Sequence, residues 1–250
     1  MKRWLLLLWL LVPVALLSYH FGPGQAALAY RQSQQNFQLA QELEETGHFD
    51  EAIDQYGEAL SSLPATTEPA AVARDQIRLA QVRVRFQQGR LAETLSSLGV
   101  LVEEIEQTHG ADSALAYETR DFLGRVHYQA MAALRLESAE KEVWLRHWEL
   151  SRQNYRYLAE HTPGGRNDRD RRNLEVVIKS FNDPVPPTAA SAAGGGFDTA
   201  GLTDVITPPP PDAPIAPGFG PPPPTVIDAR PREPTPESPA PELNEFDLGS

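Results

Sequence analysis

The six histidines are the residues whose chemistry can be judged most directly from spacing. No two of them show the i, i+4 helical spacing with an intervening glutamate that zinc hydrolases use. The chain has no cysteine, which excludes a disulfide framework, a thiolate zinc site and a cysteine nucleophile. It also has no Gly-x-Ser-x-Gly elbow, no Gly-x-Gly-x-x-Gly motif and no phosphate-binding loop. We therefore predict that the protein is not an enzyme and has no catalytic residue, no cofactor and no metal site.

Two carboxylates near the end of the middle part of the chain, Asp168 and Asp170, resemble calcium ligands at first sight. The segment lacks the further oxygen positions and the bidentate glutamate of a calcium loop. Asn167 is a suitable N-cap, and acidic side chains are favourable at a helix N-terminus. We therefore interpret these residues as the start of a helix.

The charge and the prolines divide the 250 residues into three parts. The 34 acidic and 22 basic side chains give a net charge of −12, and 18 of the 23 prolines lie after residue 182. The middle part is long enough to fold as one domain, whereas the last part is too rich in proline and acid to form a core. The expected parts are a head (1–29), a helical domain (30–182) and a solvated tail (183–250). The acidic balance argues against nucleic-acid binding, which needs clustered Lys and Arg.

The head has the pattern of an export segment. Lys2 and Arg3 precede an uninterrupted apolar run from Trp4 to Leu17, and the stretch 4–21 approaches the length needed to cross a bilayer. A retained single-span anchor is the favoured interpretation, and a cleaved signal peptide is the alternative. In both, the rest of the chain lies outside the cytoplasm.

The middle part is predicted to be helical nearly throughout, because Ala, Leu, Gln, Glu and Arg dominate and proline occurs only between apolar-periodic segments. Thr67, Asp112 and Asn167 are expected helix starts, and Gly47, Gly89 and Gly110 expected helix ends. The expected helices span residues 26–46, 50–62, 68–88, 91–107, 112–136, 139–160 and 168–181.

The first helix pair carries the most specific pattern in the sequence. Small residues at regular positions allow two antiparallel helices to approach closely, a glycine permits the turn, bulky residues fill the space beside the small ones, and a proline stops the second helix. The residues that form this pattern are Leu39, Ala40, Leu43, Gly47, Phe49, Ala52, Tyr56, Ala59 and Pro64.

This pattern resembles the tetratricopeptide repeat family, whose unit of about 34 residues has the same order of small and large residues. Asn36 departs from it, since the family often has a large aromatic there and this chain has Phe37 next to it. The resemblance implies an all-α, right-handed stack of helical hairpins. It weakens along the chain: Gln88–Thr94 repeats the turn, Leu98 and Leu101 stand for Tyr56 and Ala59, and Leu123–Gly124 suggests a third unit.

The export segment, the degenerate repeat units and the terminal segment Asn167–Glu175 together are also similar to the membrane-anchored tetratricopeptide proteins encoded beside MoxR-type ATPases and von Willebrand A domain proteins. This looser resemblance implies a non-catalytic role in the assembly or maturation of an exported complex.

The tail contains proline runs at 208–211 and 221–224, which favour an extended, solvated conformation. It is interpreted as a spacer, or as a ligand for aromatic-lined grooves of a partner. An apolar cluster at its end, which includes Phe246, is a candidate short binding motif.

The candidate partner-binding residues are of the types that most often anchor protein contacts. Trp144, Trp148 and Tyr155 share one helix face; they either pack against the helix 112–136 or line a concave groove. In the second interpretation, Trp148→Ala should weaken partner capture and leave the melting temperature nearly unchanged. The candidate protein-binding residues are Trp148, Arg152, Tyr155, Arg78, Arg85 and Phe246.

The function expected from the sequence is a non-catalytic, membrane-anchored adaptor that binds other proteins outside the cytoplasm. The alternative is a structural spacer, or a self-associating membrane protein whose tail is the binding element.

Overall fold

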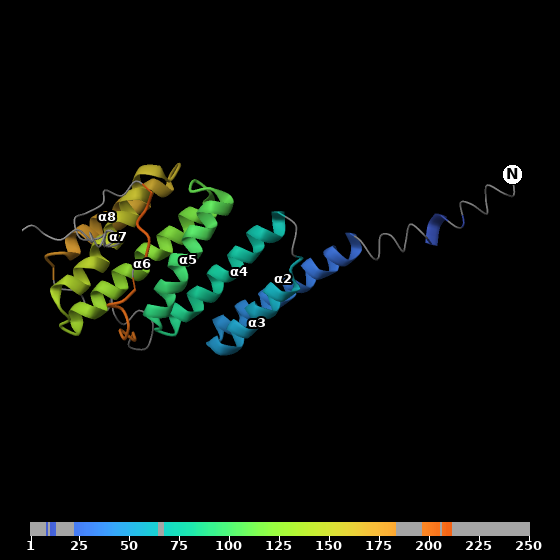
Figure 1. Cartoon of the computed structure of the whole chain (residues 1–250), viewed down its shortest axis with the longest axis horizontal. Coiled ribbons are helices and arrows are strands. Elements are labelled where there is room, and N and C mark those ends of the chain that lie inside the picture. Colours follow the sequence, from blue (N-terminus) through green and yellow to red (C-terminus); the bar gives the residue numbers. More distant parts are fainter. Residues whose placement is uncertain are drawn as a thin grey trace, which may run out of the picture. The chain divides into compact units, whose positions relative to one another are not determined.

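The computed structural model describes residues 9, 11–13, 23–64, 68–183, 197–205 and 207–211. Within these ranges the chain is all-α and forms no strand, only one isolated parallel bridge between Arg90 and Asp198. Consecutive helices pack on one another along the chain (Figure 1). The helices are α2 (Pro23–Glu45), α3 (Phe49–Ser62), α4 (Glu68–Gln87), α5 (Leu91–His109), α6 (Ala114–Leu136), α7 (Lys141–His161) and α8 (Arg166–Ser180).

The predicted helices all exist, and their ends lie within three residues of the predicted ones. Two predicted caps are wrong. The N-cap of α6 is Ser113 rather than Asp112, because the Ser113 hydroxyl accepts the Ala116 N–H at 3.2 Å. Asn167 lies inside α8, and its side-chain amide donates instead to the carbonyl of Ala159 at 2.7 Å. Thr67 lies outside the described residues.

The three hairpins α2–α3, α4–α5 and α6–α7 turn in the same way. Gly47, Gly89 and Ser138 occupy equivalent positions and have φ angles of 79°, 80° and 58°. Each donates its N–H to the carbonyl three residues before, and the following residue donates to the carbonyl five residues before it. These paired hydrogen bonds satisfy the last carbonyls of the first helix. Glycine adopts the left-handed backbone conformation that the turn requires at little cost. The repetition of this turn defines a residue-by-residue correspondence between the hairpins.

The packing of the first hairpin follows the predicted pattern, with one exception. Ala40, Ala52 and Ala59 are fully buried, and Tyr56 fills the space beside them with its hydroxyl donating to Glu44 at 2.9 Å. Leu39, however, was expected on the buried face and is 43% exposed. In its place the neighbouring aromatic residue of α2, Phe37, packs against Tyr56 at a ring distance of 5.4 Å. Among the remaining residues of the pattern, Leu43 and Phe49 are half-buried, and Pro64 follows the end of α3.

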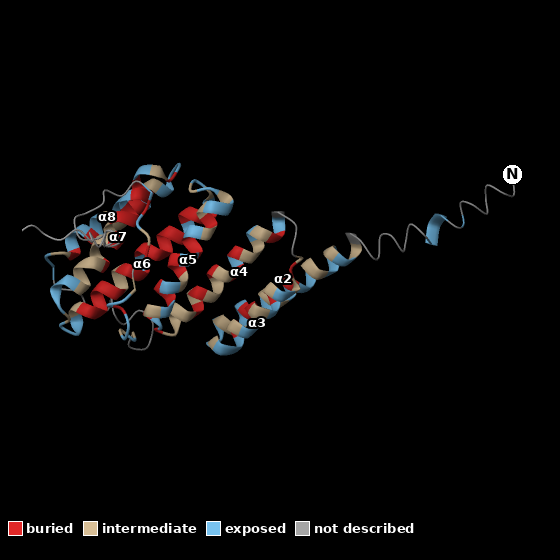
Figure 2. Cartoon of the chain, viewed as in Figure 1, coloured by how far each residue is buried: buried red, intermediate tan, exposed pale blue. Residues whose placement is uncertain are grey.

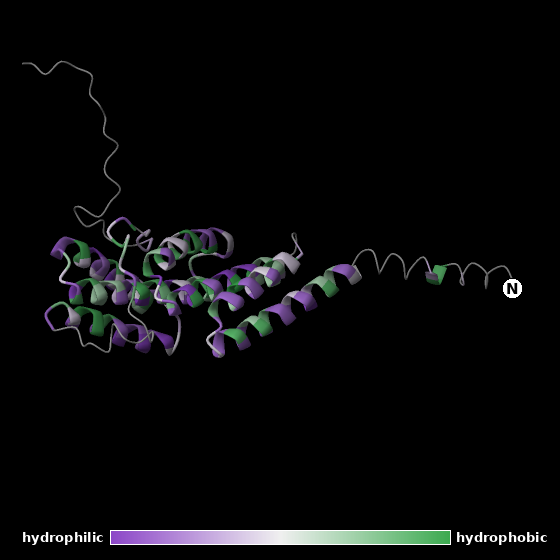
Figure 3. Cartoon of the chain, turned by 90° about the horizontal axis from the view of Figure 1, so that it is seen from below, coloured by the Kyte–Doolittle hydropathy of each residue, from purple (hydrophilic) through white to green (hydrophobic). Residues whose placement is uncertain are grey.

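The largest core lies among α4, α5, α6 and the start of α7. Figure 2 shows that buried residues are abundant on α5, α6 and α7, each of which has helices on both sides. In Figure 3 the helices carry both hydrophobic and hydrophilic residues along their length. Such amphipathic helices stabilise the fold by burying one face against a neighbour.

No helix in the described part of the chain combines the length and the apolar character needed to cross a membrane. The predicted anchor at 4–21 falls outside the described residues, apart from residues 9 and 11–13.

The tail differs from the prediction over part of its length. Residues 197–205 and 207–211, here called the docked segment, pack against the helices. The reason is local: Phe197, Leu202 and Val205 supply apolar side chains that the average composition of the tail conceals. Phe246 and the rest of the acidic end lie outside the described residues.

Candidate partner-binding groove

The docked segment lies in a groove formed by α5 on one side, α7 on the other and α6 at the base (shown in orange in Figure 1). This groove is called the filled groove. The start of the docked segment is held by a backbone hydrogen bond, in which the Asp198 N–H donates to the Gly89 carbonyl at 2.9 Å. The Phe197 ring packs against the Phe86 ring with centroids 5.6 Å apart. The Thr199 hydroxyl donates to Glu137 at 2.5 Å.

The middle of the docked segment is anchored by one apolar side chain. Leu202 is 1% exposed and belongs to the main core. Full burial of a leucine side chain contributes about 1.5–3 kcal/mol. Arg146 adds a polar contact by donating to the Thr203 carbonyl at 3.1 Å.

A glycine of α5 lets the docked segment approach the helix backbone closely. A β-carbon placed on Gly99 would lie 3.4 Å from the Thr207 methyl and 3.5 Å from the Pro208 ring. These distances leave no room for a larger side chain. A side chain longer than that of alanine at this position would therefore meet the docked segment.

Two histidines join the base of the filled groove to the docked segment. His147 Nε2 lies 3.2 Å from the Leu202 carbonyl, which only accepts, so we assign the proton of the neutral ring to Nε2. His147 Nδ1 then accepts from His127 Nδ1–H at 3.0 Å. His127 Nε2 in turn accepts from the Thr207 hydroxyl at 2.6 Å. The result is one hydrogen-bonded chain that runs from Thr207 through both rings to Leu202.

Both histidines are held neutral by this environment. Burial lowers the pKa of His147 to about 4; the hydrogen bond to the Leu202 carbonyl opposes this shift, and the neighbouring Arg146 charge contributes to it. Burial, together with the charge that His147 would carry, also holds the pKa of His127 well below its usual value. Among the described residues no group of three or more His, Asp or Glu side chains is arranged to hold a metal ion.

The predicted contact residues on α7 have structural partners. Tyr155 is 5% exposed and lies beside Gly124, where an added β-carbon would come within 3.2 Å of its ring. The Trp148 indole N–H donates to the Val177 carbonyl of α8 at 2.8 Å, and its ring packs on Phe181. Tyr155 therefore packs against α6, as the first of the two interpretations expected, whereas Trp148 connects α7 to α8. Because Trp148 holds two helices together, we now expect Trp148→Ala to lower the melting temperature.

The predicted arginines divide into paired and unpaired ones. Arg152 makes two hydrogen bonds to Glu149, at 2.8 and 2.6 Å, and these hydrogen bonds raise its pKa. Arg78 pairs with Glu104 and with Asp75. The Arg85 side chain makes no ion pair or hydrogen bond with the described residues, and it lines an open pocket between α3 and α5. Of the predicted arginines, Arg85 is therefore the one whose charge is available to a partner.

A second charged surface, where α4, α6 and α8 meet, is largely self-neutralised. Arg83 pairs with Glu118 at 2.7 Å, and Arg125 and Arg169 both contact Asp121, at 3.2 and 3.5 Å. The buried Asp170 nearby has a raised pKa, mainly because of desolvation. Arg83, Arg125 and Arg169 therefore already have carboxylate partners, unlike Arg85.

Sequence reasoning missed the docked segment, the histidine pair and the buried Arg120. The sequence does contain a signal for the docked segment. Gly57 and Gly99 are each the ninth residue of the second helix of a hairpin. Of these two glycines, Gly99 lies against the docked segment, so an interior helix glycine was the available signal for that contact.

Comparison with protein-family models, with curated proteins and with solved structures gave no significant match to this chain.

The contribution of Leu202 can be tested directly. We expect Leu202→Asp to detach residues 197–211, because an unpaired carboxylate in an apolar site costs several kcal/mol and the segment can leave without unfolding the helices. Amide hydrogen exchange of the segment should become fast, while the helical circular dichroism changes little. Leu202→Met, which conserves volume, is the control. Continued protection of the segment in the aspartate variant would show that backbone contacts alone hold it.

Proposed function

We propose that this protein is a non-catalytic adaptor of tetratricopeptide type that binds extended segments of partner proteins in grooves between its helical hairpins. One observation carries the proposal: the helical domain already holds a non-helical segment of its own chain, the docked segment, in the filled groove. A rigid groove of this kind binds an extended peptide at little ordering cost on its own side.

The repeat character is supported by the packing of the first hairpin and by the three equivalent turns. Ala40, Ala52 and Ala59 are buried where the two helices approach, and Tyr56 lies between them. The turns at Gly47, Gly89 and Ser138 share one hydrogen-bond pattern despite their different spacing along the chain. This is the expected behaviour of a repeat whose later units have diverged in sequence.

The location is proposed from the sequence alone. Lys2, Arg3 and the apolar stretch 4–21 favour a single-span anchor with the helical domain outside the cytoplasm. An adaptor in that position assists the assembly or maturation of an exported complex.

The test is affinity purification of the full chain from native membranes after mild cross-linking, in parallel with versions that lack 30–182 or 212–250. We expect the same partner proteins with the full chain and with the version lacking 212–250, and their loss without 30–182. Recovery of only the protein itself would instead support the self-associating, structural alternative. Partners lost with 212–250 alone would make the end of the tail the binding element.

A further inference from the structure

A second groove, equivalent to the filled one, lies one hairpin earlier in the chain. It is formed by α3 on one side, α5 on the other and α4 at the base, and is called the open groove. Matching Gly47 to Gly89 aligns α3 with α5, so that four residues on one face of α3 correspond to four residues of α5, of which Ala92 and Gly99 lie against the docked segment. The pairs are Asp50 and Ala92, Ile53 and Leu95, Asp54 and Ser96, and Gly57 and Gly99.

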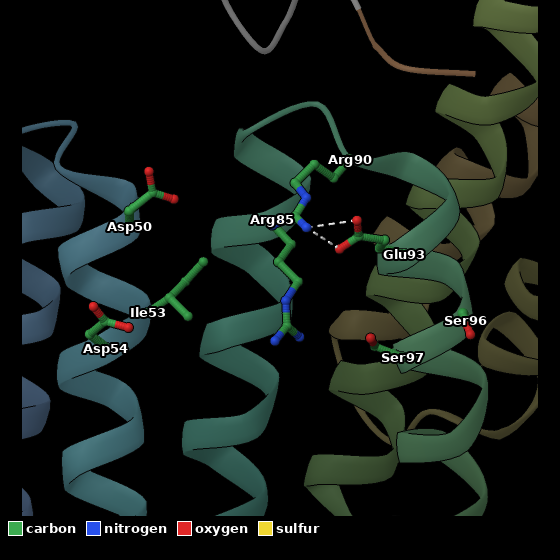
Figure 4. Close-up of a pocket in the computed structure, with 8 residues that line it drawn as sticks. All are labelled: Asp50, Ile53, Asp54, Arg85, Arg90, Glu93, Ser96 and Ser97. Atoms are coloured by element: carbon green, nitrogen blue, oxygen red, sulfur yellow. Dashed lines mark hydrogen bonds and ion pairs between the residues drawn. The ribbon is translucent and has the colours of Figure 1, made fainter. Parts of the chain in front are cut away.

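The two glycines differ in what covers them. Gly99 lies under Thr207 and Pro208, whereas a β-carbon on Gly57 would meet no atom within 4 Å. The open groove has a volume of about 500 Å³. Figure 4 shows that its lining side chains come from α3, α4 and α5 and surround an open space between the helices. The residues that line it are Asp50, Ile53, Asp54, Arg85, Arg90, Glu93, Ser96 and Ser97.

The chemistry of the open groove differs from that of the filled one at two positions. The base of the filled groove contains Leu134, which packs in the same core as Leu202. The equivalent residue in the open groove is Arg85. The carbonyl of Leu134 accepts from the residue five positions later, just after the turn, and the carbonyl of Arg85 does the same. On the α3 side, Asp54 replaces the neutral Ser96. A segment with leucine at the central position would leave Arg85 desolvated and unpaired, which is unfavourable.

The other charges of the open groove already have partners. Arg90 pairs with Glu93 at 2.6 Å, and Asp50 accepts from Gln88 at 2.8 Å. Arg85 and Asp54 are therefore the charges left to select a ligand.

We propose that the open groove binds an extended segment of a partner protein, with a carboxylate side chain facing Arg85 and a lysine or arginine one to three residues later facing Asp54. The order follows from the docked segment: Leu202 lies in the core with Leu134, Gly201 lies 3.7 Å from Ala92, and the chain reaches Gly99 only at Thr207. Residues 203–205 lie between these two contacts in the sequence, and Ser96, the counterpart of Asp54, lies between Ala92 and Gly99 on α5. This inference rests on the proposed function and adds the chemistry of the partner and the site that binds it.

The probe is a fluorescent peptide with the sequence of residues 197–211 carrying Leu202→Glu and Asp204→Lys. The glutamate prevents entry into the filled groove and supplies the carboxylate for Arg85. We expect saturable binding to the full chain by fluorescence anisotropy. A peptide with the charges exchanged (Leu202→Lys, Asp204→Glu) should bind at least about tenfold more weakly, because charge-assisted hydrogen bonds are replaced by repulsion.

Two protein variants locate the site. Arg85→Ala should weaken binding of the probe at least about tenfold, and Arg85→Lys should restore part of it. Gly57→Leu should abolish binding by filling the groove, yet keep or raise the melting temperature because leucine is a better helix former than glycine. Arg31→Ala, which removes an exposed arginine of α2 outside the groove, is the matched control.

The proposal is overturned if the full chain does not bind the probe, if the exchanged peptide binds equally well, or if Arg85→Ala and Gly57→Leu leave binding unchanged. These outcomes are separate from those of the purification experiment. Partners captured through 30–182 without binding of the probe would leave the adaptor function standing and remove only the open groove.

Discussion

Lowering the pH from 7 to 4 should release residues 197–211 from the filled groove while the helices remain folded. A proton added to His147 enters at Nδ1 and places two N–H groups face to face at His127 Nδ1 and His147 Nδ1, which are 3.0 Å apart. A proton added to His127 enters at Nε2, which then no longer accepts from the Thr207 hydroxyl. The hydrogen-bonded chain between Thr207 and Leu202 is then broken. The nearest fixed charge that acts on His147 is the cationic Arg146, so the added positive charge has no compensating partner there.

The direction of the pH effect follows from linkage. The docked state lowers the pKa of His147 from 6.5 to about 4, so it binds fewer protons than a state in which the ring is solvated. The contribution of the pair to docking is complete above pH 6.5 and is lost as the pH falls toward 4. At 1.36 kcal/mol per unit of pKa, His147 alone accounts for at most about 3 kcal/mol. His127, whose pKa is also lowered, adds to it in the same direction.

The absence of cysteine makes the release simple to measure. Thr203→Cys places one unique thiol on the exposed side of the docked segment, and a spin label there should become mobile between pH 6.5 and 4. His147→Gln keeps a donor for the Leu202 carbonyl without titrating, and together with His127→Gln it should make the mobility of the label independent of pH. A label that stays immobile at pH 4 in the native chain, with circular dichroism unchanged, would contradict the role of the pair.

Arg120→Ala should lower the free energy of unfolding by about 3–5 kcal/mol, the range measured when one partner of a buried ion pair is removed. Arg120 on α6 is 1% exposed, and its Nε–H donates to Glu106 of α5 at 2.5 Å. It also donates to Asn154 at 3.2 Å and lies 5.3 Å from the ring centroid of Tyr157, both on α7. One side chain thus joins three helices, and its loss leaves Glu106 without its counter-charge.

The comparison with an apolar replacement separates the charge from the packing. Urea unfolding of the full chain should show a similar loss for Glu106→Gln, which leaves the guanidinium uncompensated. The double variant Arg120→Met with Glu106→Leu should recover much of the stability, because well-packed apolar residues often replace a buried pair at no cost. If Arg120→Ala lowers the free energy of unfolding by less than about 1 kcal/mol, the pair contributes no more than an ordinary surface ion pair, which would contradict the prediction.

The helices could be predicted from the sequence because their signals are local. The alanines at 40, 52 and 59, the glycine at 47 and the proline at 64 act within one hairpin, and the helix ends confirm them. Asp112 and Asn167 were assigned as caps because both residue types cap well, but the choice between adjacent polar residues depends on the turn that the chain makes before the helix.

The site could not be predicted in the same way because its contacts are long-range. His127 and Thr207 are 80 residues apart in the sequence, and Arg120 meets Asn154 only because α5, α6 and α7 surround it. The docked segment was hidden by the proline and glycine around it. Trp148 and Tyr155 share one face of a single helix, but they contact two different neighbours, α8 and α6, which no pattern within α7 distinguishes.

The way in which the docked segment is attached sets a threshold for any competitor of the filled groove. Arg135 donates a hydrogen bond to the carbonyl of Asp183, and Glu137 accepts one from the Thr199 hydroxyl. Both residues lie at the end of α6, so Asp183 and Thr199, on either side of the connection 184–196, are fixed close to it. A connection this short gives the segment an effective concentration on the order of millimolar. A free peptide of equal intrinsic affinity must reach that concentration to occupy half of the sites. Partners at cellular concentrations below it would therefore reach the filled groove only after the segment has been released.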